Sequence, residues 1–311
     1  MTPRVGTQTR VDRLGAALVI VAAIAFSAKG IFVKLAYGDL NIPARVDPVT
    51  LLTLRMVLAL PMFGLIAWWS SQKTVHSLTR RDWLSIGAIG LVGYYGASLL
   101  DFWGLMYISV SLERLILFLN PTIVVFISVL VIRYRITSRD VLALVISYAG
   151  IAFVFINDLN DFDAKRDAVI LGGTLVLLSA ILYAIYLVAA GQMIKRIGAV
   201  RFAAYASIIS TIAIGSHFML THDIHMLLRL SPQIWSMSAG MALFSTVLPI
   251  VMMAEGMRRI GSSNAAMMSS IGPVATIFMG YVFLGDTITA IQLCGAALVM
   301  AGVLLISSKK S

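Results

Sequence analysis

Residues 14–24 read Leu-Gly-Ala-Ala-Leu-Val-Ile-Val-Ala-Ala-Ile, and the apolar character continues with few interruptions to Tyr37. A helix of about 20 apolar residues is long enough to cross the hydrocarbon core of a bilayer. The side chains of this segment do not alternate between apolar and polar, as those of an outer-membrane barrel strand do. The segment therefore predicts a membrane-spanning helix.

The rest of the chain repeats this pattern. Of its 311 residues, 59% are hydrophobic and only 12% are charged, and the mean hydropathy is +0.94. A soluble domain has roughly 25% charged residues. We therefore expect an all-α integral membrane protein with ten transmembrane helices, at residues 14–37, 49–69, 83–108, 111–132, 141–157, 168–191, 202–220, 234–256, 262–284 and 289–307.

The basic residues lie mostly on one side of the predicted membrane. Lys and Arg are frequent before the first helix and in alternate loops, whereas the loop after the fifth helix carries Asp158, Asp161 and Asp163. Cytoplasmic loops are rich in Lys and Arg, so we expect both termini in the cytoplasm and a multi-pass plasma membrane protein, in a bacterium the inner membrane. The net charge of +10 then reports topology in a lipid bilayer, and no nucleic-acid partner is expected.

The two halves of the chain are related. Pro121 aligns with Pro273 and Gly150 with Gly302 without a gap. Because each half has an odd number of helices, the second half enters the membrane from the opposite side, an arrangement typical of secondary transporters that work by alternating access. The expected division is an N-terminal tail at 1–13, a first five-helix repeat at 14–157, an acidic outer loop at 158–167, a second five-helix repeat at 168–307 and a C-terminal tail at 308–311.

A longer motif strengthens this interpretation. Residues 263–273 read Ser-Asn-Ala-Ala-Met-Met-Ser-Ser-Ile-Gly-Pro, followed by Phe283-Leu-Gly-Asp286, and residues 111–121 echo the motif in the first half. The pattern resembles the EamA repeat of the drug/metabolite transporter superfamily over nearly the whole chain. The resemblance implies ten helices, with the third, fourth, eighth and ninth at the centre, and the export or exchange of small metabolites. It leaves the substrate open.

Ionisable residues interrupt the first four predicted helices. Lys29, Arg55 and Asp101 lie roughly 9–12 Å below the predicted outer end, at 1.5 Å per residue, and Glu113 and Arg114 begin the fourth helix. A charge at the bilayer centre costs of order 2.5–3.5 kcal/mol and usually faces a partner or a cavity. Three cations against two carboxylates leave one positive charge, which an anionic or zwitterionic substrate can neutralise. The alternative is a purely structural salt-bridge network.

Polar and aromatic residues complete the predicted site. The second half lacks the charges, and it offers aromatic and hydroxyl groups suited to an apolar or amphipathic part of a substrate. The candidate substrate-binding residues are Lys29, Arg55, Tyr94, Ser98, Asp101, Glu113, Arg114, Asn120, Tyr183, Tyr186, Asn264 and Ser270. The candidates for a coupled proton are Asp101, Glu113 and Glu255, and the candidate hinges are Pro121 and Pro273.

No enzymatic activity, cofactor or metal site is expected. The chain has one cysteine, Cys294, and no Walker A, nucleophile-elbow or HExxH motif. We expect a secondary transporter that exports or exchanges a small anionic or zwitterionic metabolite by alternating access. The alternatives are a lipid or polyprenyl-phosphate flippase and a transport-inactive membrane scaffold. Gly295 and Gly302 in the tenth helix predict either close helix packing or a homodimer through helices five and ten.

Overall fold

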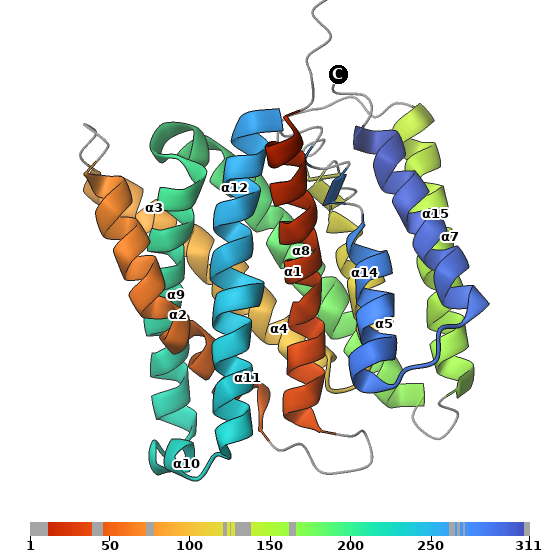
Figure 1. Ribbon diagram of the computed structural model, residues 1–311, viewed down its shortest axis with the longest axis horizontal. Helices are drawn as coiled ribbons and strands as arrows, with labels where there is room; N and C mark the ends of the chain where they lie inside the picture. The colour runs from red at the N-terminus through yellow and green to blue at the C-terminus, as the bar shows by residue number, and fades with distance from the viewer. Residues whose placement is uncertain are drawn as a thin grey trace, which may run out of the picture.

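The computed structural model describes residues 12–38, 46–72, 78–120, 123–124, 126–127, 138–161, 166–260, 265, 268–269 and 271–307. Every regular element in this part of the chain is helical, and the long helices lie side by side (Figure 1). The all-helical prediction is therefore confirmed. The start of α1 and the end of α15 lie at the same end of the bundle, which we call the terminal end; the opposite end is the far end (Figure 1).

The elements follow one another in two sets. The first set is α1 (Arg13–Tyr37), α2 (Pro48–Ser71), α3 (Arg80–Gly90), the π-helical segment η1 (Leu91–Ala97), α4 (Ser98–Gly104), α5 (Val110–Leu117) and α7 (Ser138–Asp161). The second set is α8 (Arg166–Ile197), α9 (Ala199–Thr221), the short α10 (His225–Leu228), α11 (Pro232–Ala242), the π-helical η3 (Leu243–Val247), α12 (Leu248–Ile260), α14 (Gly272–Met279), the π-helical η4 (Gly280–Leu284) and α15 (Ala290–Ser307). The helix α3–η1–α4 is continuous, and so is α11–η3–α12.

Six helices in the described ranges are long and apolar enough to span a membrane, at Arg13–Tyr37, Pro48–Ser71, Arg80–Gly104, Arg166–Gly191, Ala199–Thr221 and Pro232–Ile260. Three shorter apolar helices lie at Val145–Phe155, Gly272–Leu284 and Ala290–Gly302. Some boundaries differ from the predicted ones. Helix α7 continues to Asp161 and α8 begins at Arg166, so helical residues occupy both ends of the segment predicted as an acidic loop.

Side-chain caps fix where the first helices begin. Asp12 accepts hydrogen bonds from the backbone N–H groups of Leu14 and Gly15 at the start of α1. Thr79 and Asp82 form a reciprocal capping box at the start of α3, which satisfies backbone donors that the first helical turn leaves free. The Arg259 side chain and the Gly15 N–H group hold the pKa of Asp12 below its usual range. These caps mark the terminal end of both helices.

Two helix crossings use glycines at matching positions in the two halves. A Cβ on Gly256 in α12 would lie 3.1 Å from the carbonyl oxygen of Gly15 in α1. A Cβ on Gly104 in α4 would lie 2.9 Å from the carbonyl oxygen of Gly172 in α8. The register that pairs Pro121 with Pro273 also pairs Gly104 with Gly256, at a separation of 152 residues, and a separation of 157 residues pairs Gly15 with Gly172. The α1–α12 crossing in one part of the bundle is therefore repeated by the α8–α4 crossing in the other.

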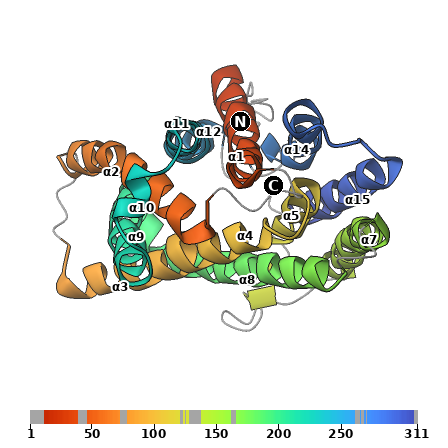
Figure 2. The same ribbon diagram turned by 90° about the horizontal axis from the view of Figure 1, so that it is seen from below.

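The bundle has two long sides (Figure 2). Helices α3, α4 and α8 form one side, and α1, α11 and α12 form the opposite one. Between these sides, α2 packs on α9 at one lateral edge of the bundle, and α7 packs on α15 at the other. At the α7–α15 contact, a Cβ on Gly150 would lie 2.7 Å from the carbonyl oxygen of Gly295. The small-residue face of α15 thus packs within the chain, so a homodimer through α7 and α15 would use other faces of these helices.

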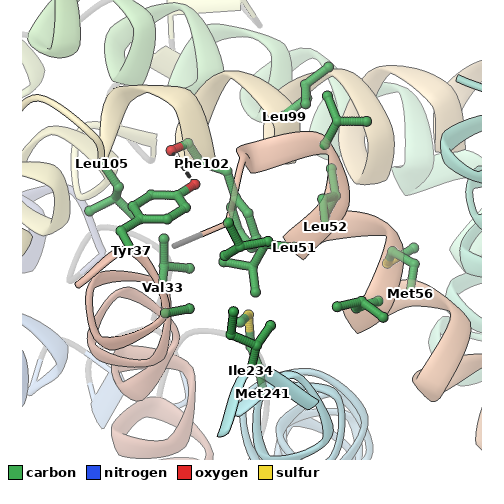
Figure 3. Close-up of a cluster of buried hydrophobic side chains, with 14 of the residues drawn as sticks. Val33, Tyr37, Leu51, Leu52, Met56, Leu99, Phe102, Leu105, Ile234 and Met241 are labelled. Carbon is green, nitrogen blue, oxygen red and sulfur yellow. Dashed lines mark hydrogen bonds between the residues drawn. The ribbon is translucent and has the colours of Figure 1, made fainter. Parts of the chain in front are cut away.

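A buried hydrophobic cluster fills the space between the helices near the far end (Figure 3). It joins the end of α1 to the start of α2, the end of α4 and the start of α11. The Tyr37 hydroxyl donates a hydrogen bond of 2.9 Å to the carbonyl oxygen of Phe102, which ties α1 to α4. Among the side chains in this cluster are Val33, Leu51, Leu52, Met56, Leu105 and Met241, all of them buried.

Candidate functional site

A cavity of about 410 Å³ lies between the two long sides of the bundle. Residues of α1, α2, η1, α4, α5, α8, η3 and α12 line it. Both halves of the chain therefore contribute to its wall. The predicted substrate-binding residues that line the cavity are Lys29, Arg55, Tyr94, Ser98, Asp101, Arg114, Asn120 and Tyr183.

Lys29 is the shared counterion of two carboxylates. Its Nζ lies 2.5 Å from Oδ2 of Asp101 and 3.1 Å from Oε1 of Glu113. The side chains of Asp101 and Glu113 are only 3% and 1% exposed, so both charges need a partner in the interior. These contacts join α1 to α4 and α5. Asp101 lines the cavity, whereas Glu113 is outside the cavity wall.

Two guanidinium groups line the same cavity without a carboxylate within 4.0 Å among the described residues. Arg55 lies 3.5 Å from the Ser98 hydroxyl, and its guanidinium carbon stands 5.2 Å from the centre of the Phe102 ring. Arg114 stands 5.5 Å from the centre of the Phe118 ring. In both arginines Nε is buried and has no hydrogen-bond partner in the described part of the chain. A guanidinium has five N–H donors arranged to bind carboxylate or phosphate oxygens.

A glycine in α14 leaves space for the guanidinium of Arg114. A Cβ on Gly272 would lie 2.9 Å from Nη2 of Arg114 and 3.1 Å from the Phe118 ring. The Ser27 hydroxyl of α1 donates a hydrogen bond of 3.0 Å to the carbonyl oxygen of Gly272. The sequence interpretation missed Gly272 as a site residue, although the glycine directly precedes Pro273 in the repeated motif.

Two π-helical segments contribute to the wall. Gly93, Tyr94 and Ala97 come from η1, and Ser245 and Thr246 come from η3. The two segments begin at matching positions of the two halves, since the register that pairs Gly104 with Gly256 also pairs their first residues. Single π-helical turns are frequent at functional sites because they change the direction of side chains along a helix. The apolar periodicity of the sequence gave no signal for them.

Tyrosines form another part of the wall. Tyr94 and Tyr183 line the cavity, and the buried Tyr186 supports both. The ring of Tyr186 stacks on Tyr183 at 5.3 Å, and its hydroxyl donates a hydrogen bond of 3.2 Å to the Tyr94 hydroxyl. Phe26, which the sequence interpretation also missed, lines the cavity three residues before Lys29 on the same face of α1. The cavity thus offers aromatic surface beside its charges.

The structure does not bring every predicted residue to the cavity. Glu255 accepts hydrogen bonds of 2.6–2.7 Å from Arg258 and Arg259 at the terminal end, and it does not line the cavity. Pro273, a candidate hinge, lies in the first turn of α14, where a residue without an N–H group is tolerated. Asn264, Ser270 and Pro121 lie outside the described residues.

Comparison with known proteins identifies the family. The model of the EamA-like transporter family matches residues 13–156 and again residues 170–308. The chain belongs to the EamA-like transporter family. This transporter is 30% identical to the uncharacterized transporter YcbK of Bacillus subtilis, over 90% of this chain and 88% of the relative. It is 25% identical to an uncharacterized transporter of Archaeoglobus fulgidus, over 95% and 97% of the two chains.

The fold of this EamA-like transporter is also found in a solved crystal structure. The two chains superpose with a TM-score of 0.63 at 15% sequence identity, over 94% of this chain and 95% of that chain. At this identity the likeness shows the fold alone. Family, relatives and apolar helices together make the protein a membrane transporter, as the sequence motif predicts.

Proposed function

We propose that the protein is a secondary transporter that exports or exchanges a small anionic or zwitterionic metabolite by alternating access. Its ten transmembrane helices form two inverted repeats, with both termini in the cytoplasm, and in a bacterium it resides in the inner membrane. The repeated α1–α12 and α8–α4 crossings support this arrangement. So do the π-helical segments that line the cavity from matching positions of the two halves.

The observation that carries the proposal is the pair of guanidinium groups in the cavity wall. Lys29 is the shared ion-pair partner of Asp101 and Glu113, and Arg55 and Arg114, which have no carboxylate within 4.0 Å among the described residues, can bind an anionic group. Ion pairing with a guanidinium is stronger in a cavity than in water, because the local dielectric constant is lower. Oδ1 of Asp101 has no hydrogen-bond partner among the described residues and can accept from an ammonium group, which also suits a zwitterion.

Exposed aromatic residues support the membrane placement. Trp and Tyr are enriched where a membrane protein meets the headgroup region. Trp68, Trp69 and Trp83 are exposed towards the terminal end, and Trp103, Tyr107 and Trp235 are exposed towards the far end. These two groups fit the two interfaces of one bilayer. The terminal end also carries Arg80, Arg81, Lys195, Arg196, Arg258 and Arg259, as the positive-inside rule requires of the cytoplasmic side.

A thermal-shift screen tests anion binding at this site. Purified protein is heated with carboxylates, phosphate monoesters and amino acids, and a ligand of the folded state raises the melting temperature by mass action. We expect stabilisation by at least one anion, and its loss in Arg114→Gln. The control is Arg201→Gln, because Arg201 is a buried arginine that packs on Tyr205 away from the cavity. An unchanged shift in Arg114→Gln, or no shift with any anion, contradicts the proposal.

A further inference from the structure

Glu113 occupies an unusual place beside the cavity. Its side chain is 1% exposed, and it lies against α1, where a Cβ on Gly30 would stand 3.4 Å from Oε2. Lys29 contacts Glu113 and also lines the cavity, so the ammonium lies between this carboxylate and the cavity. The sequence interpretation treated Glu113 as a substrate ligand, whereas its position is that of a group reached through Lys29.

Few charged groups act on Glu113. They are Lys29 on α1, Asp101 on α4 and the adjacent Arg114 on its own helix. Helices α7, α8, α14 and α15 also pack against or near α5, and none of their described charged side chains forms an ion pair with Glu113. Lys29 is therefore the single ion-pair partner of Glu113 in the described part of the chain.

A substrate with two negative charges changes the net charge of the ionisable groups at the cavity. Lys29, Arg55 and Arg114 carry three positive charges and Asp101 and Glu113 two negative ones, so the empty cluster is positive by one. A dianion would make it negative by one and would draw the Lys29 ammonium towards the cavity. Glu113 would then be a buried carboxylate without its partner, a state that desolvation makes strongly unfavourable. A buried carboxylate in that state binds a proton instead.

We infer that the cavity binds a dianion, a dicarboxylate or a phosphate monoester, together with one proton taken from water by Glu113. The inference rests on the proposed function and adds the charge of the substrate and the identity of the coupled ion. Loaded in this way, the cluster is neutral, since a dianion and a proton together cancel the single positive charge of the empty site. Neutrality favours passage of the loaded site through a low-dielectric membrane. Lys29 is the positioning residue that connects the two binding events.

Two matched ligands separate the charge of the substrate from its size. Succinate has two carboxylates, and succinamate has the same length with one carboxylate replaced by an amide. Glycerol phosphate serves as the phosphate monoester. Binding is measured by titration calorimetry in two buffers that differ in ionisation enthalpy, at a pH where each dianion is fully ionised, because the difference in heat reports the number of protons taken up.

We expect at least one of the two dianions to bind with uptake of about one proton, and its affinity to rise by up to about tenfold for each unit by which the pH falls. Glu113→Gln should bind without proton uptake and with an affinity independent of pH. The matched control is Glu255→Gln, the chain's other glutamate, which lies outside the cavity and should retain proton uptake. Succinamate should bind more weakly than succinate and without proton uptake if the dicarboxylate is the substrate class.

A second measurement uses the wild-type protein alone. Infrared difference spectra should show the band of a protonated carboxyl group when the dianion binds. Dianion binding without proton uptake, no such band, proton uptake retained in Glu113→Gln, or proton uptake lost in Glu255→Gln overturns the inference. If monoanions alone bind, the proposed function stands and the inference fails. If no anion binds the wild-type protein, both fail.

Discussion

Gly272 of α14 lies directly against the guanidinium of Arg114 in α5, at a place where an added Cβ would stand 2.9 Å from Nη2. The contact joins the predicted ninth helix to the predicted fourth, one from each half of the chain, at the wall of the cavity. The position of the guanidinium therefore depends on the absence of a side chain in the other half.

Gly272→Ala should reduce the free energy of anion binding more than it reduces the free energy of unfolding. The added methyl group displaces the flexible end of Arg114, or the Phe118 ring on which it packs, and moves the guanidinium away from its place in the wall. We expect a loss of affinity of up to about tenfold, which corresponds to about 1.4 kcal/mol. Titration calorimetry measures it. Gly215→Ala is the control, because a Cβ there meets nothing within 4 Å, and equal affinities in the two variants would contradict the prediction.

Removing Lys29 should destabilise the protein more than removing one of its partners. Lys29→Met leaves two buried carboxylates without a counterion, and breaking a buried ion pair from one side costs about 3–5 kcal/mol. Asp101→Asn leaves the contact between Lys29 and Glu113 in place. Thermal unfolding of the purified variants measures the difference. A Lys29→Met variant that melts at or above the temperature of Asp101→Asn would show that the network does not hold these helices together.

Replacing glycine by alanine should lower thermal stability at the helix crossing of each half. Gly104→Ala and Gly256→Ala each place a methyl group against the backbone of the crossing helix, at 2.9 Å and 3.1 Å from a carbonyl oxygen. We expect both variants to lose thermal stability, and Gly191→Ala to lose none, since that position is open and alanine favours the helix. A loss in one crossing and not in the other would argue against matching roles of the two halves.

Labelling of single cysteines tests the proposed topology. In a Cys294→Ser background, Asp223→Cys places a thiol next to α10 at the far end, and Gln72→Cys places one after α2 at the terminal end. A membrane-impermeant maleimide added to intact cells should label Asp223→Cys and leave Gln72→Cys unlabelled until the cells are opened. The reverse pattern would place the termini outside.

Much of this architecture follows from the sequence, and the exceptions have physical causes. Depth along each predicted helix places Lys29 and Asp101 in one layer, because the rise per residue is fixed. Helical periodicity also separates Glu113 from Arg114 by about 100°, and they do have different surroundings, one against Lys29 and the other against Phe118. Helical periodicity does not predict which neighbouring helix a given face of a helix packs against.

Tyr186 illustrates this limit. The sequence predicts it as a substrate ligand like Tyr183. In the structure its ring packs on Gly93 and is buried behind the wall of the cavity. That placement depends on a glycine in another helix, which no local pattern of α8 contains. The π-helical segments escape prediction for a similar reason, because one extra residue in a turn is invisible in a run of apolar side chains.

The central claim is that the cavity holding Arg55 and Arg114 carries an anion across the membrane. Counterflow tests it most directly. Proteoliposomes loaded with an unlabelled carboxylate, phosphate monoester or amino acid are placed in the same labelled compound at low concentration. For at least one anion, the wild-type protein and Arg201→Gln should accumulate label above protein-free liposomes, and Arg114→Gln should not. Label accumulated equally by Arg114→Gln and the wild-type protein, or no accumulation with any anion, would contradict the claim.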